Sequence, residues 1–203
     1  MTNKEMMLNG DLYMFEDDLG KISLRSRNLL DKINNTKHTN FNKRSKLVKK
    51  LFGSTGNNIV LNKPLYCDYG ENIHVGENFY SNFNLTILDV NKVVIGNNCF
   101  IGPNVSIYTA GHPIDADVRI TMLEFGKEIN IGNNVWIGGN AVINPGVTIG
   151  DNVVIASGAI VTKSFESNLI IGGNPAQVIR KITDEDRVYW NLQRDKYYQL
   201  IKK

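Results

Sequence analysis

An aliphatic side chain recurs at every sixth position through much of this chain, and this period limits the possible folds more than any other feature. Another apolar or small residue lies two positions before most of them, so each repeat contains a very short strand with two inward side chains. The phase is kept across the gap between residues 107 and 131. The repeating positions are Ile95, Ile101, Ile107, Ile131, Ile137, Ile143, Ile149, Ile155 and Val161.

Turn-forming residues separate these short strands. The triplets at 132–134 (GNN), 144–146 (NPG) and 150–152 (GDN) tolerate positive φ or start a turn. Corners this frequent exclude a long helix and an ordinary sandwich, so the period predicts an all-β solenoid, a parallel β-helix. The general rule for parallel crossovers favours a right-handed coil. The 27 Asn and 18 Gly of the chain fit a fold that needs a corner in almost every repeat.

Charge is distributed unevenly along the chain. Residues 1–52 hold 11 Lys and Arg against 6 Asp and Glu, whereas residues 53–175 hold 5 against 10. The repeat region is therefore acidic, which argues against a nucleic-acid-binding surface there. The basic run at 43–50 is interpreted as the solvated face of a helix, with anion binding as the alternative.

Both ends of the chain are predicted to be helical. Apolar residues have near-helical spacing in 22–33 and 41–52, and Thr183–Asp186 resembles a capping box with Asp in place of Glu. We expect these helices to pack on the solenoid. The expected units are a helical N-terminal segment at 1–57, the solenoid at 58–175 with an inserted loop at 113–128, and a C-terminal segment with a helix at 176–203.

The composition also bears on where in the cell the protein is expected. No run approaches the roughly 18 to 20 apolar residues of a membrane span, and residues 1–10 lack the apolar core of a secretory leader. Cys67 and Cys99 lack CxxC or metal-ligand spacing and are interpreted as structural. We expect a cytoplasmic protein with no membrane or nucleic-acid partner.

The outward positions of the repeat are unusually apolar. Four of the five residues that precede the repeat positions 137 to 161 are apolar, and the set is Trp136, Val142, Thr148, Val154 and Ile160. An isolated solenoid would expose them as a large apolar face. A ligand groove or cover by the end helices would explain this face, but we favour oligomerisation with ligand bound at the subunit contact.

His112 is the candidate functional residue. The repeat lapses between Pro113 and Glu128, and loops inserted on a rigid scaffold are where binding and chemistry concentrate. By the repeat phase, His112 points outward at the start of this loop, whereas His38 lies in a polar linker and His74 inside a repeat turn. A metal centre is disfavoured because no His-x-x-His or His-x₃₋₅-His pair exists.

Several longer motifs add a resemblance to these inferences. They are Ile107–Asp115, Asn130–Gly150 and Ile171–Ala176, with Cys67–Gly70, Asn78–Asn84 and Glu124–Lys127 in addition. Together they resemble the maltose and galactoside O-acetyltransferases, a family of hexapeptide-repeat acyltransferases, over nearly the whole chain. The resemblance implies a left-handed parallel β-helix, a homotrimer with active sites between neighbouring subunits, and no metal. It also implies acetyl transfer from acetyl-CoA to a hydroxyl of a sugar such as maltose, glucose or a galactoside, without a covalent enzyme intermediate.

The resemblance assigns roles to individual residues. His112 matches the catalytic histidine, a general base whose neutral imidazole takes the proton of the attacking hydroxyl. Asn82 matches the active-site asparagine, which contacts the acceptor and can donate to the developing oxyanion. Glu124 is expected to orient His112, by analogy with catalytic triads. The acceptor side is expected to comprise Asp17, Asp68, Asn82 and Asp89, so the N-terminal segment at 1–57 is expected to contribute to it. The family's CoA positions are occupied here by Trp136, Gly139, Ser157, Thr162, Lys163 and Arg180.

Some positions depart from the galactoside type. Gly139 stands in place of a serine, Gln177 in place of an arginine, and Val90 in place of an acidic residue. At these positions and at Asp68 the chain is more similar to the maltose type. Two alternatives stay open: an acetyltransferase for another hydroxyl acceptor (a xenobiotic such as an antibiotic, serine or a lipo-oligosaccharide), and a non-catalytic β-solenoid assembly module that binds no CoA.

Overall fold

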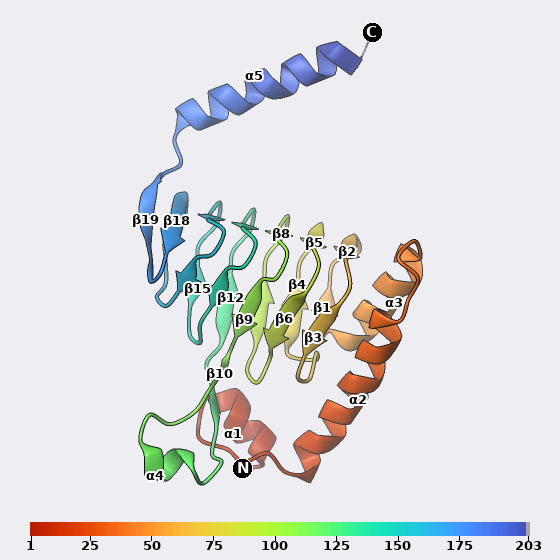
Figure 1. The fold of residues 1–203 in the computed structure, drawn as a ribbon, viewed down its shortest axis with the longest axis vertical. Coiled ribbons are helices and arrows are strands. Elements are labelled where there is room, and N and C mark those ends of the chain that lie inside the picture. The colour runs from red at the N-terminus through yellow and green to blue at the C-terminus, as the bar shows by residue number, and fades with distance from the viewer. Residues whose placement is uncertain (202–203) are drawn as a thin grey trace.

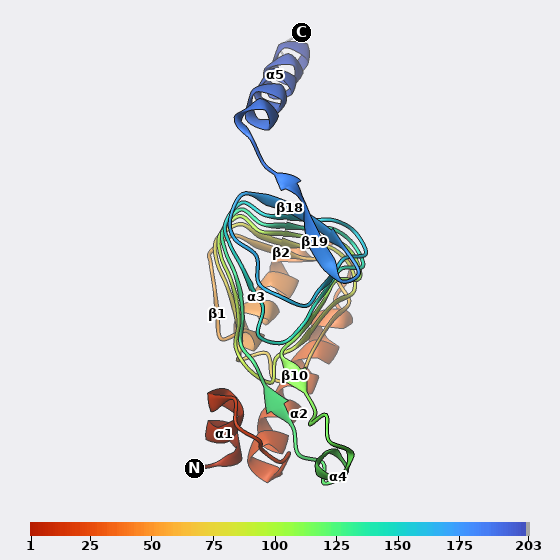
Figure 2. The ribbon, with the colours of Figure 1, turned by 90° about the vertical axis from the view of Figure 1, so that its left-hand side faces the viewer.

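The computed structural model describes residues 1–201 and shows a parallel β-solenoid with helices at both ends (Figure 1). Viewed along its axis, the solenoid has three sides, each formed by one sheet, and the strands are parallel except for the last strand of one sheet (Figure 2). The predicted all-β solenoid with helical ends is confirmed, whereas the left-handed sense stays a prediction from the resemblance. In the described part of the chain, no helix is long and apolar enough to cross a membrane.

The three sheets take their strands in turn from successive coils. The first contains β1 (Ser54–Thr55), β4 (Ile73–Val75), β7 (Val93–Ile95), β12 (Ile129–Ile131) and β15 (Thr148–Ile149). The second contains β2 (Ile59–Leu61), β5 (Phe79–Ser81), β8 (Phe100–Ile101), β13 (Trp136–Ile137), β16 (Val154–Ile155), β18 (Leu169–Gly173) and β19 (Ala176–Lys181). The third contains β3 (Leu65–Cys67), β6 (Leu85–Leu88), β9 (Ser106–Tyr108), β14 (Val142–Ile143) and β17 (Ile160–Val161).

The repeat positions form the core, as the period predicts. In the first sheet Ile95 pairs in register with Ile131, which pairs with Ile149, so equivalent side chains lie directly above one another. None of the nine repeat positions is more than 3% exposed. Each buried side chain of this size contributes about 1.5 to 3 kcal/mol to stability. The columns therefore provide a continuous core without a disulfide; Cys67 and Cys99 are both free.

Asparagine residues form most corners. Among residues 1–201, nine non-glycine residues have positive φ, and eight of them are Asn. Asn tolerates this left-handed backbone better than most residues because its short amide bonds locally. The amides also bond from coil to coil: Nδ2 of Asn78 donates to Oδ1 of Asn98 at 2.8 Å, and Nδ2 of Asn98 donates to Oδ1 of Asn134 at 3.0 Å. The excess of Asn is thus explained by the corners.

Three helices precede the solenoid: α1 (Asn3–Asn9), α2 (Asp17–Asn34) and α3 (Phe41–Leu51). The two longer ones were predicted, and α3 covers the first coil, where Val48 and Leu51 join the core. Helix α1 was not predicted because seven residues are too few to show periodicity. Its ends are nevertheless specified by local residues: a capping box between Thr2 and Glu5 begins the helix, and Gly10, at φ 83°, ends it.

The C-terminal part differs from expectation. After β18 the chain reverses, and β19 pairs antiparallel with β18, so the sheet continues past residue 175. Helix α5 (Asp184–Ile201) then extends away from the body (Figures 1 and 2). Trp190 is 66% exposed and Leu192 63%, so the expectation that this helix packs on the solenoid is wrong for a single chain. A capping pattern specifies where a helix begins, not what covers it.

The Asn corners lead to a stability prediction. Asn134 has φ 57° and accepts the amide of Asn98, so Asn134→Ala should lower the free energy of unfolding by about 1 to 3 kcal/mol. Asn134→Gly loses the hydrogen bond but tolerates the backbone, so it should lose less. Urea unfolding of both variants checks this order, and an alanine variant as stable as wild type would contradict it.

Candidate active site

The inserted loop leaves and rejoins the solenoid through a short antiparallel ladder. β10 (Ala110–Gly111) pairs with β11 (Phe125–Gly126), and the short helix α4 (Ala116–Arg119) lies between them. His112 follows β10 directly, at the base of the loop. The rigid coil therefore fixes the backbone of His112, whereas the loop beyond it is exposed.

A cavity of about 260 Å³ lies at the base of this loop. It brings together three predicted site residues, His112, Asp68 and Glu124, which lie far apart in the chain. The N-terminal segment also contributes to its wall. The lining residues are Phe15, Ser23, Arg27, Asp68, Tyr69, Leu88, Val90, Ala110, His112 and Glu124. Within residues 1–201, no group of three or more His, Cys, Asp or Glu is arranged to hold a metal ion.

Asp89 lies beneath this cavity rather than in its wall. The residue is fully buried, and its Oδ1 accepts the backbone N–H groups of Asp68 at 3.0 Å and Tyr69 at 2.9 Å. Its Oδ2 has no hydrogen-bond partner among the described residues. Asp89 therefore positions the turn that carries Asp68, and it is not among the residues that line the cavity.

Two carboxyl groups of this region have altered acidity. Burial raises the pKa of Asp89 to about 7, and the neighbouring Asp68 adds to the rise. Burial also raises the pKa of Asp68 to about 6, with repulsion from Glu124 as a second cause and attraction to Arg27 opposing it. Slightly acidic conditions thus protonate both groups, and the negative charge of the cavity varies with pH.

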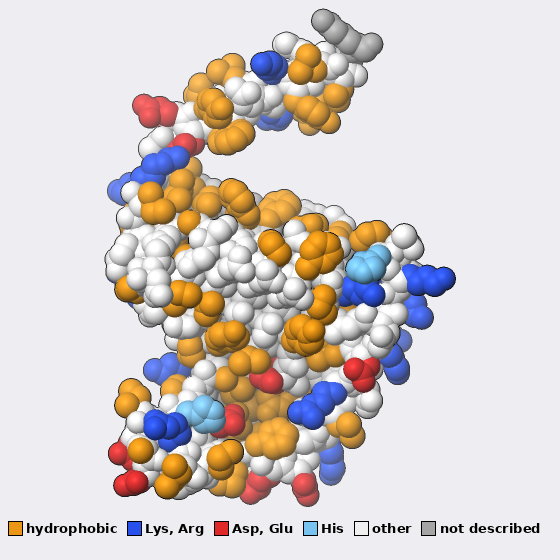
Figure 3. All heavy atoms as spheres, in the orientation of Figure 1, with side chains coloured by type: hydrophobic (Ala, Val, Ile, Leu, Met, Phe, Trp, Pro, Cys, Tyr) orange, Lys and Arg blue, Asp and Glu red, His pale blue; other side chains and the backbone are white. Residues whose placement is uncertain are grey.

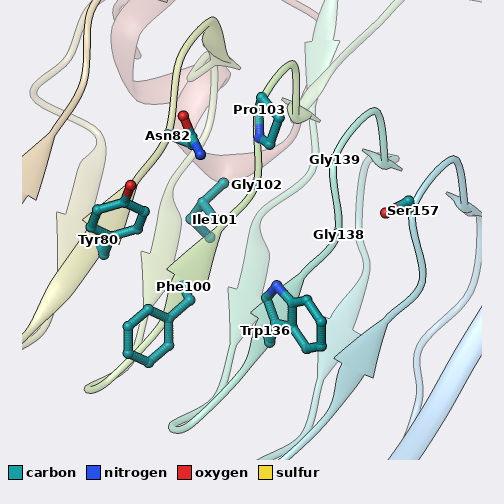
Figure 4. Close-up of a pocket in the computed structure, with 10 residues that line it drawn as sticks. All are labelled: Tyr80, Asn82, Phe100, Ile101, Gly102, Pro103, Trp136, Gly138, Gly139 and Ser157. Carbon is teal, nitrogen blue, oxygen red and sulfur yellow. The ribbon is translucent and has the colours of Figure 1, made fainter.

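A second groove, of about 540 Å³, lies on the outer face of the second sheet (Figure 4). Its floor is aromatic, since Tyr80, Phe100 and Trp136 occupy equivalent outward positions on β5, β8 and β13. Turn residues line its rim, among them the predicted residues Asn82, Gly139 and Ser157. Phe100 and Trp136 are 52% and 56% exposed. The groove therefore offers an apolar platform bordered by polar turn groups.

The remaining predicted residues line neither cavity. Lys163 donates to Oε1 of Gln177 at 2.9 Å, and Thr162 precedes it after β17. Arg180 makes two hydrogen bonds to the carboxylate of Asp186, at 2.6 and 2.8 Å, which hold the pKa of Asp186 down at about 2. Asp17 is the first residue of α2. These residues are not gathered into one site within a single chain.

Sequence reasoning did not identify two residues of α2 that line the first cavity. Ser23 and Arg27 lie four residues apart on that helix and line the cavity together with Phe15. Their spacing places them on one helical face. This spacing shows only that the side chains of Ser23 and Arg27 point in the same direction. It does not show which residues they approach, because those residues lie more than forty positions later in the chain.

The outer surface carries further apolar side chains. They are scattered over the solenoid and along α5 in the view of Figure 3. Among the predicted outward residues, Trp136 and Thr148 are exposed, whereas Val142, Val154 and Ile160 are half-buried. Tyr66 and Phe83 add further exposed aromatic rings, at 51% and 47%.

A closed aliphatic core with external cavities and an inserted histidine-bearing loop defines a hexapeptide-repeat transferase. Comparisons with known proteins agree with this class. Residues 128–163 match the bacterial transferase hexapeptide (six repeats), residues 92–122 the hexapeptide repeat of succinyl-transferase, and residues 6–56 the maltose acetyltransferase hexapeptide capping motif. The chain belongs to the maltose and galactoside O-acetyltransferase family and is an acetyltransferase of that type.

Individual relatives cover most of the chain. It is 47% identical to the galactoside O-acetyltransferase of Escherichia coli (strain K12), over 82% of each chain. Among solved structures, a maltose O-acetyltransferase from Clostridium difficile 630 is 48% identical, with a TM-score of 0.89 and coverage of 90% of this chain and 98% of that one. A galactoside acetyltransferase in complex with coenzyme A is 44% identical, with a TM-score of 0.89 and coverage of 92% and 94%.

The acidity of Asp89 leads to a pH prediction. Its pKa is raised in the folded chain, so this carboxyl favours the fold below about pH 4 and that contribution is lost as the pH rises through about 7. Asp89→Asn keeps an oxygen for both N–H donors but cannot ionise. We expect the variant to be more stable than wild type at about pH 8, by roughly 1 to 4 kcal/mol.

The measurement is urea unfolding of both proteins between about pH 4 and pH 8. The difference in unfolding free energy should shrink toward the acidic end, where the wild-type carboxyl is protonated. Parallel pH profiles for the two proteins would contradict the prediction.

Proposed function

We propose that this chain transfers the acetyl group of acetyl-CoA to a hydroxyl of a small sugar, with His112 as the general base. The observation that carries the proposal is the cavity that places His112 beside Asp68 and Glu124, in a chain of this family. A sugar presents several hydroxyl donors, and carboxylates are suited to accept them. The apolar wall formed by residues such as Phe15 suits the C–H face of a sugar ring.

The chemical step needs one base and one group that stabilises an oxyanion. The neutral imidazole of His112 takes the proton of the acceptor hydroxyl while that oxygen attacks the thioester carbonyl. The amide of Asn82 donates to the oxyanion that develops on the carbonyl oxygen. Collapse of the tetrahedral intermediate breaks the C–S bond, and the imidazolium returns the proton to the departing CoA sulfur. No covalent enzyme intermediate forms.

The carboxylates in and near the first cavity have separate proposed roles. Asp68 accepts hydrogen bonds from acceptor hydroxyls. Asp89 holds the backbone of Asp68 through Oδ1, and its Oδ2, unpartnered among the described residues, is kept as a proposed contact for the acceptor. Glu124 orients His112 by accepting from its second ring nitrogen. Asp17, the first residue of α2, is also proposed to contact the acceptor.

The second groove is proposed to bind acetyl-CoA. Trp136 packs on the pantetheine arm, while Gly139 and Ser157 offer polar groups at the rim. Thr162, Lys163 and Arg180 bind the polar and phosphate end, for which the last two supply charge. Arg180 would share its guanidinium with Asp186, its partner in the free chain. The coenzyme A complex of a 44% identical relative supports this co-substrate.

A complete site is proposed to require two subunits. Asn82 lines the groove, whereas His112 lines the other cavity, so a single chain does not bring the two together. A homotrimer of parallel solenoids would place the groove of one subunit against the loop of the next. It would also cover part of the exposed aromatic surface, which otherwise faces water.

His112→Ala should lower kcat by about two to four orders of magnitude, because the attacking hydroxyl loses its base. CoA affinity, measured by calorimetry, should stay unchanged because His112 lies outside the groove. His38→Ala is the matched control, as that side chain is exposed in the α2–α3 connection. Activity is read as CoA thiol release with a panel of sugar, serine and xenobiotic acceptors.

Three outcomes would contradict the proposal. Undiminished turnover of His112→Ala would exclude this base, and turnover only with non-sugar acceptors would exclude the proposed substrate class. Absence of CoA binding would favour a non-catalytic assembly module.

The two-subunit site is tested by mixing inactive variants. Asn82→Ala and His112→Ala homo-oligomers should each be nearly inactive. Co-expressed as hybrids, they should regain up to about a quarter of the wild-type activity, because random assembly leaves that share of interfaces with both residues intact. Equal mixtures of the separately assembled variants serve as the control. Hybrids as inactive as the parents would contradict a shared site.

A further inference from the structure

Tyr13 and Glu124 are joined by three hydrogen bonds across 111 positions of the chain. Their backbones form an isolated antiparallel bridge, with the N–H of each donating to the carbonyl of the other at 3.0 Å. The Tyr13 hydroxyl also donates to Oε2 of Glu124 at 2.7 Å. The N-terminal segment is thereby fastened, through backbone and side chain, to the returning arm of the inserted loop.

The Tyr13 ring is held in a small core of its own. It is 1% exposed and packs in a cluster with Met7, Leu19, Tyr69 and Val90, separate from the core of the solenoid. Tyr69 and Val90 of this cluster also line the cavity with His112. Burial raises the pKa of Tyr13 well above its usual value, so the phenol keeps its proton and acts as a donor.

Asn91 provides a second connection between the same parts. Its buried Nδ2 donates to the carbonyls of Met7 at 3.2 Å and Leu8 at 3.3 Å in α1, and to that of Gly126 at 3.1 Å in β11. Helix α1 and the inserted loop lie together at the end of the molecule opposite α5 (Figures 1 and 2). The surroundings of Tyr13 are therefore anchored on both sides.

This anchoring leaves one oxygen of Glu124 for the cavity. Oε2 is occupied by the phenol, whereas Oε1 makes no hydrogen bond to any other residue of the described chain. An unbonded carboxylate at the edge of an exposed loop would sample many rotamers. One that is bonded on one side and carried by a paired backbone has far fewer.

We propose that Tyr13 is a positioning residue that holds Glu124 in the wall of the cavity that His112 also lines, and that ties the inserted loop to the N-terminal segment. The inference rests on the proposed function, because it deepens the role given there to Glu124. Tyr13 does not line the cavity itself and acts only through the glutamate. The N-terminal segment thus contributes to catalysis by ordering the loop as well as by lining the cavity.

The test is a double-mutant cycle of Tyr13→Phe and Glu124→Ala. Tyr13→Phe keeps the ring and removes only the hydroxyl, so the fold should persist, while kcat falls about tenfold and the KM for acetyl-CoA is unchanged. If the hydroxyl acts through Glu124, the double variant should match Glu124→Ala within about twofold. Independent losses that multiply, or a Tyr13→Phe variant with wild-type kcat, would overturn the proposal.

A second readout does not depend on turnover. Amide hydrogen exchange of residues 113–124 should be faster in Tyr13→Phe than in wild type, and Ser45→Ala is the matched control. Ser45 lies on α3, away from the cavity, and its hydroxyl donates to the Ile59 carbonyl at 3.2 Å. The Ser45→Ala variant should therefore change neither the amide exchange of the loop nor kcat. Unchanged loop exchange in Tyr13→Phe would overturn the inference.

The two proposals fail in different ways. A wild-type protein that releases no CoA thiol with any sugar refutes the proposed function, and hydrogen exchange still decides whether Tyr13 holds the loop. An active wild type with additive losses refutes only the role of Tyr13.

Discussion

The structure depends on the in-register stacking of equivalent aliphatic side chains in parallel strands. Ile137 pairs directly with Ile101 on one side and with Ile155 on the other, and the counterparts on the other two sheets pair in the same way. Such columns persist only if each coil advances by the same length and turns at the same place. The corners meet this condition because most of them place an Asn in the positive-φ region of the backbone. Hydrogen bonds between the Asn amides of successive coils repeat the coil spacing on the outside of the molecule.

Aliphatic side chains fill the core of the solenoid, and both candidate cavities lie outside it. The groove arises from the repeat itself, because outward residues in register form a flat platform of Tyr80, Phe100 and Trp136. The cavity around His112 arises from the departures from the repeat. Its wall combines an inserted loop, a turn held by Asp89 and a helix from the N-terminal segment.

The parts that the sequence predicted are those set by local periodicity. The buried columns, the two longer N-terminal helices and the outward placement of His112 all follow from spacing along the chain. Contacts between distant segments leave no such trace. The bond from Tyr13 to Glu124 and the approach of Arg27 to Asp68 depend on how the N-terminal segment docks on the coil. For α5, the apolar residues were visible, but the absence of a packing surface within the chain was not.

This division between regular and irregular parts bears on substrate choice. The cavity wall combines the apolar side chain of Val90 with the carboxyl groups of Asp68 and Glu124, and under the proposed function these groups decide which acceptors are paired. Unpaired polar groups are what allow a site to reject a wrong acceptor. Asp68 lies outside the aliphatic columns, whereas Val90 also packs in the buried cluster around Tyr13, so an exchange of Val90 would disturb that cluster. Under the proposed function, acceptor specificity can therefore vary at Asp68 while the aliphatic columns stay constant.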